Sequence, residues 1–360
     1  MSDRFADMTA FVAASGWGEA DIESFPGDAS TRRYFRLTRG DERAVLMDAP
    51  KGAEAPNEPE GATHEERVKL GYNAIARLAG PDPAAFTCID NELVIRGFSA
   101  PKILAADLDA GFLLLEDFGA SVYARVIEND PSLERPLYEA AVDCLGEIYR
   151  SSFPSRLKWR ESRWRVRDYD ETALLAETDL FLDWYAPDAG LEISDDLRQE
   201  LYGLFRESFA YLKTQPPGLA LRDFHAENLF WLPERESVAK VGLIDFQDAL
   251  FCHPAYDLMS LITDIRRDVS PDLKDILIER FCEVAKISDV DAFRAAYAVL
   301  SVQRGTKLLG FPVRADLKFG KPQYRVLLPR VKRHLRDDLS HPAVAPIKAW
   351  YDQHLPGGLT

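Results

Sequence analysis

Cysteine, histidine and long apolar runs are scarce in this sequence of 360 residues, which has four cysteines and six histidines. The cysteines, Cys88, Cys144, Cys252 and Cys282, are far apart and form no Cys-x-x-Cys pair. Their spacing predicts neither a disulfide framework nor a zinc site. No apolar stretch is long enough to cross a bilayer, and the N-terminus lacks the basic start and apolar block of a signal peptide. We therefore expect a cytoplasmic protein without a membrane segment.

Positive charge is also in short supply. The 44 Lys and Arg residues face 59 Asp and Glu residues, which gives a net charge of -15. No basic stripe is present, so nucleic acid is not an expected partner, and a small anionic ligand would need a local basic site. Hydrophobic residues make up 46% of the chain, which is ordinary for a globular protein with room for two domains.

The first third of the chain alternates short apolar segments with turn residues. A turn at 26–28 precedes the strand-like segment YFRL, and a turn at 39–41 separates it from the segment AVLM. This pattern predicts an antiparallel meander after an N-terminal helix. Residues 48–64 are rich in Ala, Pro, Glu and Gly and predict a mobile loop, and a helix is expected over 65–80. A buried strand, Phe112 to Leu115, then ends at Glu116 and Asp117.

The remaining two thirds are mainly helical by periodicity, with a single strand hairpin made by NLFWL and VGLIDF. The expected helices span 120–151, 168–185, 194–213, 254–266, 271–285 and 288–308. These patterns predict an α+β fold with two lobes: a small β-rich nucleotide-binding lobe at 1–118 and a larger α-helical catalytic and acceptor-binding lobe at 119–360. A cleft between two such lobes is a common place for a small-molecule site.

The stretch LRDFHAENLFW carries the clearest motif. Leu221-Arg222-Asp223 followed after four residues by Asn228 resembles the kinase catalytic loop H-R-D-x-x-x-x-N, with leucine replacing histidine. Seventeen residues after Asn228, the strand VGLI ends in Asp245 of D-F-Q, where a protein kinase has D-F-G. Asp223 alone could cap a turn, and Asn228 alone could form an Asx-turn. Their order and spacing together favour the kinase interpretation.

Phosphoryl transfer from ATP requires side chains of these types. Mg²⁺ prefers hard oxygen ligands, which makes Asn228 and Asp245 its expected ligands. A carboxylate must orient the acceptor hydroxyl and take its proton, and Asp223 is the expected catalytic base. His225 lies between them without any metal-ligand pattern, so we interpret it as scaffolding or a substrate contact.

These motifs resemble the aminoglycoside phosphotransferase and choline kinase superfamily, which has the protein-kinase-like fold. More narrowly, the stretches DASTRRYFR, LMDAP, ILAADLDAGFLLLEDFG, IDFQDA and QRGTKLLGF resemble bacterial kinases of the cell-wall amino sugars N-acetylmuramate and N-acetylglucosamine. The resemblance implies ATP, Mg²⁺ and a sugar hydroxyl, specifically the anomeric one, as acceptor. It also implies that Asp257 holds the catalytic-loop backbone. We interpret Arg222 as a further structural residue and a member of an ion pair.

The main departure from the kinase pattern is Met47, which occupies the position of the lysine in V-A-I-K. A methionine cannot neutralise phosphate charge, so another cation must do so. The turn that contains Ser30, Thr31, Arg32 and Arg33 offers hydroxyls and guanidinium groups, and Lys51 is a further candidate. Either arginine alone could equally be a solvated hairpin charge.

Two further groups of residues complete the predicted site. Backbone groups at the hinge, Glu116 and Phe118, are expected to contact the adenine. The acceptor is expected to lie against helical residues, with Glu177, Trp184 and Tyr185 on or near one helix and Arg304 on another beside Gln303 and Lys307. Aromatic faces suit sugars, and a basic residue suits the lactyl carboxylate of N-acetylmuramate. Helical aromatics are nonetheless more often core residues, as we expect for Phe181.

Two alternatives remain open at this level. An aminoglycoside or choline-type acceptor fits the same catalytic motifs. A nucleotide-binding pseudokinase is suggested by Met47 and Leu221, although the presence of Asp223, Asn228 and Asp245 argues against it. The segment 81–100 has no assigned role, and the sequence does not indicate an oligomeric state.

Overall fold

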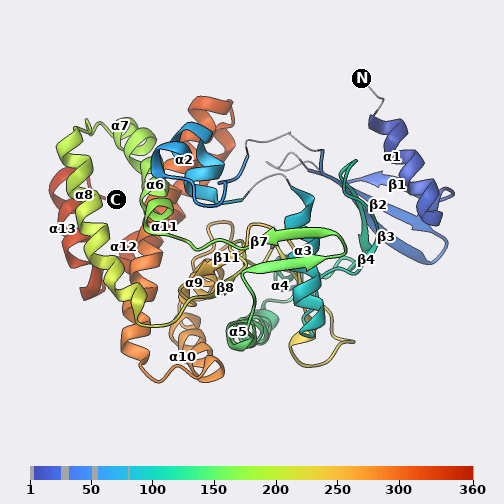
Figure 1. Cartoon of the computed structure of the whole chain (residues 1–360). Coiled ribbons are helices and arrows are strands. Elements are labelled where there is room, and N and C mark those ends of the chain that lie inside the picture. The colour runs from blue at the N-terminus through green and yellow to red at the C-terminus, as the bar shows by residue number, and fades with distance from the viewer. Residues whose placement is uncertain (1–3, 26–31, 51–55, 80–81, 360) are drawn as a thin grey trace. The chain divides into compact units, whose positions relative to one another are not determined.

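The computed structural model describes residues 4–25, 32–50, 56–79 and 82–359, which form two compact units (Figure 1). The sheet unit comprises the described parts of Met1–Cys144, Phe153–Val166 and Glu227–Ala249. The helical unit comprises Leu145–Ser152, Arg167–Ala226 and the described part of Leu250–Thr360. Because both units are discontinuous in sequence, the lobe boundary expected near residue 118 stays a prediction.

The sheet unit contains a five-stranded antiparallel sheet in the order β1-β2-β3-β5-β4, together with two hairpins. Its strands are β1 (Asp21–Ser24), β2 (Arg33–Arg39), β3 (Glu42–Asp48), β4 (Ile103–Asp107), β5 (Phe112–Glu116), β6 (Arg156–Trp159), β7 (Ser162–Arg165), β9 (Leu229–Trp231) and β10 (Val241–Leu243). Its helices are α1 (Arg4–Val12), α2 (His64–Leu70), α3 (Pro83–Ile95), α4 (Tyr123–Asn129) and the first part of α5 (Glu134–Arg150).

Helix α1 covers one face of the five-stranded sheet (Figure 1). Met8 and Val12 of this helix pack with Leu37, Leu46 and Leu114 of the sheet in one buried cluster. Side chains alternate between the faces of a strand, so Ala44 and Leu46 of β3 share this face while the intervening positions point away from it. Burial of this apolar surface fixes the register of β2, β3 and β5, on which the nucleotide side of the predicted site depends.

Helix α3 lies in the segment 81–100, to which the sequence analysis assigned no role. The helix begins with Asp82, whose side chain accepts from the backbone N–H of Ala84, and with Pro83 at its first turn. It is buried on several sides, so it shows no single apolar stripe, and this is why periodicity missed it. Phe86 of α3 stacks on Phe246 with ring centroids 5.0 Å apart. The helix therefore supports the segment that contains Asp245.

The β6–β7 hairpin was also missed. Its strands are rich in charge, and the turn between them uses Arg160 at φ 50° instead of the usual Asn-Gly or Asp-Gly pair. Arg156 and Arg165 of the hairpin form ion pairs with Glu60 and Glu58. These pairs anchor the end of the stretch 48–64, which we expected to be a mobile loop and of which 51–55 lie outside the described residues.

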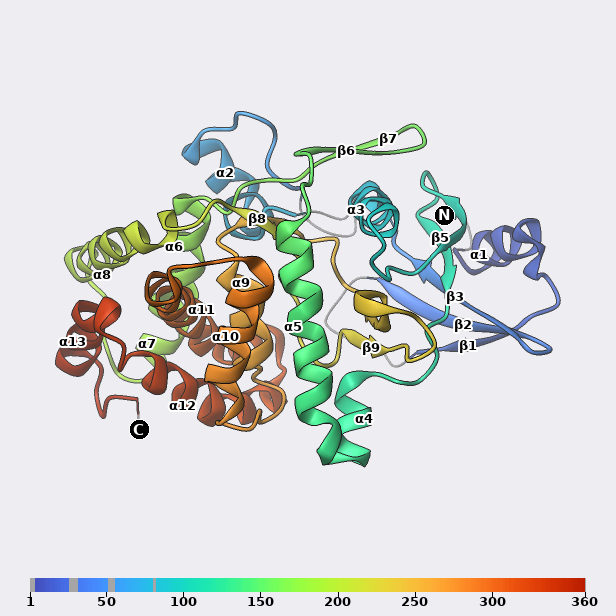
Figure 2. The same ribbon diagram turned by 90° about the horizontal axis from the view of Figure 1, so that it is seen from below.

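The helical unit contains α6 (Glu171–Leu180), α7 (Ala186–Asp188), α8 (Asp195–Ser208), α9 (Ala255–Ile262), α10 (Leu273–Ala285), α11 (Val290–Phe319), α12 (Leu328–Asp338), α13 (Ala345–His354) and the end of α5. Helix α11 packs against α6, α9 and α12, and Figure 2 shows it among these helices. Its N-terminus is capped by Asp289, and it ends at Gly320, which has φ 63°. It is longer than the helix expected over 288–308.

Helix α11 comes very near the end of α6 at Gly310, where a Cβ would lie 1.8 Å from the carbonyl oxygen of Leu180. Only glycine allows the two backbones to come this near.

A second strand pair, β8 (Gly218–Ala220) with β11 (Leu250–Cys252), also lies in this unit, so the expectation of a single hairpin after residue 118 is wrong. No helix among the described residues has the length and apolar character needed to cross a membrane.

Candidate active site

The two predicted metal ligands come together in the sheet unit. Asn228 immediately precedes β9 and Asp245 follows β10, so the antiparallel pairing of these strands brings both residues to one end of the hairpin. The amide nitrogen Nδ2 of Asn228 is 3.5 Å from Oδ2 of Asp245, and Gln247 donates to Oδ1 of the same carboxylate at 2.6 Å. Asp245 adopts φ 60°, a left-handed conformation that is uncommon for residues other than glycine.

The arrangement of Asn228 and Asp245 fits a nucleotide-bound Mg²⁺ ion. One carboxylate and one amide supply the hard oxygen donors that this ion requires, and the Asp245 side chain is 40% exposed. Among the described residues no three His, Cys, Asp or Glu side chains converge as a metal site. A nucleotide-bound Mg²⁺ ion needs only one or two protein ligands, because phosphate oxygens and water supply the others.

Arg32 and Arg33 point to different partners. The guanidinium of Arg32 is 10% exposed and lies 3.7 Å from the Asp245 carboxylate. Burial raises the pKa of the neighbouring Tyr34 to about 12, against the effect of Arg32. Arg33 instead forms a 2.5 Å ion pair with the buried carboxylate of Asp48, which also binds Arg4. Arg32 is therefore the cation placed beside the expected metal ligands.

Met47 occupies the centre of the sheet. It is 1% exposed and pairs with Tyr34 on β2 and Leu113 on β5. The hydrophobic residue at this position therefore agrees with its surroundings, and the positive charge near the metal ligands comes from Arg32. Ser30, Thr31 and Lys51 lie outside the described residues.

The predicted hinge follows β5 and runs beside the β9–β10 hairpin. Arg235 donates to Glu116 at 2.6 Å, and Arg36 donates to Asp117 at 2.7 Å. Phe118 packs against Phe230 of β9 with ring centroids 5.6 Å apart. The side chains of the hinge acids are thus used in holding the segment, which leaves recognition of a base to the backbone and to apolar faces.

The catalytic loop is fixed in the helical unit by Asp257 of α9. The Asp257 carboxylate accepts the backbone N–H groups of Leu221 and Arg222 at 2.6 and 2.8 Å. Burial raises the pKa of Asp257 to about 7, although the two N–H donors favour its charged form. Arg222 has φ 77°, and the double hydrogen bond holds this unfavourable backbone conformation in place. The geometry agrees with the predicted role of Asp257 in holding the loop.

Glu177 of α6 sits below the loop and is completely buried. Its Oε1 accepts from Arg222 and from Lys307, each at 2.6 Å, and its Oε2 accepts from the Tyr169 hydroxyl. Burial acts to raise the pKa of Glu177, but Lys307 and Arg222 lower it to about 2, so the group is ionised. We expected Glu177 to contact the acceptor. With both oxygens occupied and no exposed surface, it instead ties α6, α11 and the loop together.

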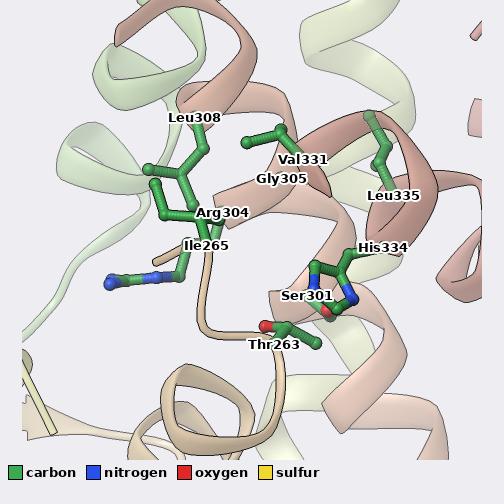
Figure 3. A pocket seen from close by; sticks show the side chains of 9 residues that line it. All are labelled: Thr263, Ile265, Ser301, Arg304, Gly305, Leu308, Val331, His334 and Leu335. Atoms are coloured by element: carbon green, nitrogen blue, oxygen red, sulfur yellow. The ribbon is translucent and has the colours of Figure 1, made fainter. Parts of the chain in front are cut away.

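Arg304 of α11 lies beside the predicted base. Its guanidinium donates to the hydroxyl of Tyr256 at 2.7 Å and is 3.9 Å from the carboxylate of Asp223. Asp223 is 38% exposed, whereas Arg304 is 12% exposed. Arg304 also lines a small pocket with Ser301 and His334, but its guanidinium points away from these side chains (Figure 3). The pocket therefore accommodates the stem of Arg304, and its charged end faces Asp223.

The remaining predicted residues have different environments. Tyr185 is 5% exposed and stacks on the buried Phe181 at 5.7 Å, so the core interpretation applies to both. Trp184 is half-buried on the same turn. Burial, with Arg266 and Arg304, lowers the pKa of His225 to about 2, so its imidazole is neutral and its predicted scaffolding role is chemically reasonable.

Sequence reasoning missed three residues that shape the site: Tyr169, Tyr256 and Gln247. Tyr169 and Tyr256 pack edge to face with centroids 5.4 Å apart, which places one hydroxyl on Glu177 and the other on Arg304. Tyr256 and Gln247 carried a local signal, because Tyr256 precedes Asp257 in the motif AYDL and Gln247 ends the motif D-F-Q. Tyr169 is distant in sequence from its partners and could not be found from spacing.

The sequence profile of the phosphotransferase enzyme family matches residues 21–297 of this chain. The chain belongs to this phosphotransferase family. It is 39% identical over 355 residues to an N-acetylmuramate/N-acetylglucosamine kinase of Caulobacter vibrioides, covering 99% of this chain and 98% of that protein. It is 29% identical to a protein of the same name from Pseudomonas aeruginosa, covering 89% of this chain and 86% of the relative.

Solved structures of phosphotransferases share the fold. The choline kinase LicA from Streptococcus pneumoniae superposes with a TM-score of 0.58 at 12% identity, covering 94% of this chain and 100% of that structure. The GDP complex of aminoglycoside 2'-phosphotransferase-IIIa gives a TM-score of 0.57 at 14% identity, with the same coverage. These matches confirm the α+β kinase-like fold that the sequence predicted. Phosphotransferases are enzymes, so the expectation of an enzyme is confirmed as well.

Proposed function

We propose that this phosphotransferase is a cytosolic, ATP-dependent kinase that transfers the γ-phosphate to the anomeric hydroxyl of N-acetylmuramate or N-acetylglucosamine during cell-wall recycling. The observation that carries the proposal is the exposed Asp223 carboxylate on a loop held by Asp257, in a chain 39% identical to a kinase named for these two sugars. The match extends over almost the whole of both chains, which supports a shared acceptor class.

The residues of the helical unit support the acceptor chemistry. Asp223 orients the sugar hydroxyl and accepts its proton as the new O–P bond forms, while the bond from the γ-phosphorus to the bridging oxygen breaks and ADP leaves. Asp257 accepts hydrogen bonds from two backbone N–H groups of the loop, which limits the movement of the Asp223 carboxylate. The single carboxylate of Glu177 pairs with both Arg222 and Lys307, so each of these cations has an anionic partner in the absence of ligand.

The residues of the sheet unit support the donor chemistry. Asn228 and Asp245 would hold Mg²⁺, which when bound shields the phosphate charge and orients the γ-phosphate. Arg32 lies beside Asp245 and supplies the positive charge that a lysine supplies in protein kinases. The hinge backbone at Glu116 and Phe118 is assigned to the adenine, and Phe118 offers an apolar face.

The role of Asp223 is tested by Asp223→Asn, which keeps the side-chain size but removes the base. We expect sugar-dependent ADP release to fall roughly 10²- to 10⁴-fold, the usual contribution of general base catalysis. The thermal shift induced by ATP with Mg²⁺ should be retained, because other residues are proposed to bind the nucleotide and the metal ion. Asp275→Asn, a change at a carboxylate that is 74% exposed on α10, is the matched control and should leave turnover intact. Wild-type turnover in Asp223→Asn would remove Asp223 from the mechanism.

The acceptor class is tested by assaying ADP release and thermal stabilisation with N-acetylmuramate, N-acetylglucosamine, kanamycin and choline, each with ATP and magnesium. Turnover of the two amino sugars alone is the expected result. Turnover of kanamycin or choline alone would favour the other acceptor classes of the fold. Nucleotide binding without turnover of any acceptor would support a pseudokinase.

A further inference from the structure

Arg304 of the helical unit lies near Asp223 and uses few of its N–H donors. Two other basic side chains near the catalytic loop, Arg222 and Lys307, both bind the buried carboxylate of Glu177. Arg304 has five N–H donors, but among the described residues its hydrogen bond is to the neutral hydroxyl of Tyr256. A guanidinium nitrogen of Arg304 lies 3.9 Å from a carboxylate oxygen of Asp223. This distance allows an ion pair but is too long for a hydrogen bond.

A guanidinium that is 12% exposed and uses few of its donors is suited to binding an anion. Desolvation makes unused donors costly, and a carboxylate matches the planar fork of the guanidinium. The α11 backbone and the Tyr256 hydroxyl hold the group in position, so little side-chain entropy is lost when an anion binds. The small pocket lined by Ser301 and His334 surrounds the stem of Arg304 and not its charged end (Figure 3).

The anion must lie close to the reacting hydroxyl, because Arg304 is next to the base that orients this hydroxyl. N-acetylmuramate differs from N-acetylglucosamine by a lactyl ether on O3, which carries a carboxylate. O3 is attached two ring carbons from the anomeric carbon, so this carboxylate lies within a few bond lengths of the anomeric hydroxyl. The transferring phosphate is assigned a different cation, Arg32, which lies beside Asp245 in the sheet unit.

We infer that Arg304 is a specificity-determining residue that binds the carboxylate of an acidic amino sugar beside the hydroxyl to be phosphorylated. This inference rests on the proposed amino-sugar kinase activity. It assigns the preference for an acidic over a neutral acceptor to a single guanidinium on α11.

The test compares kcat/KM for N-acetylmuramate with kcat/KM for N-acetylglucosamine in wild type, Arg304→Gln and Arg304→Lys. In Arg304→Gln we expect the ratio of the two values to fall roughly 10- to 100-fold, as for loss of a charge-assisted hydrogen bond. The change should lie mainly in KM for N-acetylmuramate. Arg304→Lys keeps the charge but not the planar fork, so its ratio should be intermediate.

Arg294→Gln provides the matched control, because it removes another arginine of α11 that pairs with Asp275 and Glu279. Its ratio should equal that of wild type. Equal losses on both sugars in Arg304→Gln and Arg304→Lys would overturn the inference and indicate that Arg304 serves the common chemistry. If the wild-type enzyme phosphorylates neither sugar, both the proposed function and this inference are overturned. If it phosphorylates both sugars but the ratio of the two kcat/KM values is unchanged in the Arg304 variants, only the inference is overturned.

Discussion

At the scale of single residues, the site is determined by how a few charged side chains are paired. Arg32 and Arg33 are adjacent in sequence, yet one lies beside Asp245 and the other binds Asp48. Arg33 is the first residue of β2 and Arg32 lies just before this strand, and this one-residue difference places them beside different partners. Glu177 is likewise defined by its partners, because its two oxygens accept from Arg222, Lys307 and Tyr169.

Glu177→Gln is expected to destabilise the protein and to lower turnover. Removing the charge leaves Arg222 and Lys307 buried without their shared carboxylate, which costs on the order of 3–5 kcal/mol for a buried pair. Chemical denaturation measures the stability loss, and the coupled kinase assay measures turnover. The pKa of Glu177 is depressed to about 2, so its stabilising effect is present above the ordinary value near 4.5 and is lost as pH falls through about 2.

Glu171→Gln is the control for this variant. Glu171 is on the same helix, but it is 58% exposed and pairs with Arg206, so its loss should cost less than about 1 kcal/mol. If the two variants have equal stability and activity, Glu177 does not support the loop.

At the scale of elements, α11 and α3 decide where the functional residues lie. Helix α11 carries Arg304 and Lys307 one turn apart, on the face that meets the catalytic loop. Helix α3 supports Phe246, the residue after Asp245, by ring stacking. Neither contribution follows from the local sequence, because each depends on what packs against the helix.

Gly310→Ala is expected to disturb the packing of α11 on α6. The added methyl group would overlap the carbonyl oxygen of Leu180, a backbone atom that cannot rotate away, so the helices must separate. We expect a loss of at least about 1–3 kcal/mol, the usual cost of overpacking, with lower kcat because Arg304 and Lys307 move with the helix. Thermal denaturation and steady-state kinetics measure the two effects.

Gly203→Ala on α8 is the matched control. A Cβ there meets no atom within 4 Å, and alanine favours helix over glycine by about 1 kcal/mol. This variant should be slightly more stable than wild type. If Gly310→Ala shows the same gain, the close approach of α11 to α6 is not as described.

At the scale of the whole molecule, stability should depend on pH through a buried acid that is not one of the predicted catalytic residues. Asp90 of α3 is 3% exposed, and its Oδ1 has no hydrogen-bond partner among the described residues. Burial, with Glu116 as a smaller contribution, raises its pKa to about 8. Since the folded pKa is above the ordinary value, the stability associated with the protonated form is complete below about 4 and is lost as pH rises through 8.

Asp90→Asn should therefore stabilise the protein relative to wild type at high pH. The amide cannot ionise, so the difference in unfolding free energy should grow from near zero at pH 4 to on the order of a few kcal/mol at pH 9. Urea denaturation at several pH values measures it. Glu128→Gln, a change at a side chain that is 69% exposed on α4, should show no such trend. A difference for Asp90→Asn that does not vary with pH would mean that folding does not raise the pKa of Asp90.

The sequence alone determined the residues that occur in short, ordered motifs. The motif revealed Asp223, Asn228 and Asp245, because the catalytic loop and the following hairpin are contiguous in sequence and their spacing matches the kinase pattern. The α+β fold followed from strand-like segments followed by helical ones, and the solved structures confirm it.

Only the tertiary structure decided the roles that depend on residues distant in sequence. Glu177 and Lys307 are 130 positions apart, and α3 is far in sequence from the segment it supports. Met47 looked like a defect in a linear pattern, whereas the sheet shows a buried position suited to a hydrophobic residue. Local patterns record spacing and polarity, but burial and charge pairing arise when separate elements pack, and these determined which cation lies beside which carboxylate.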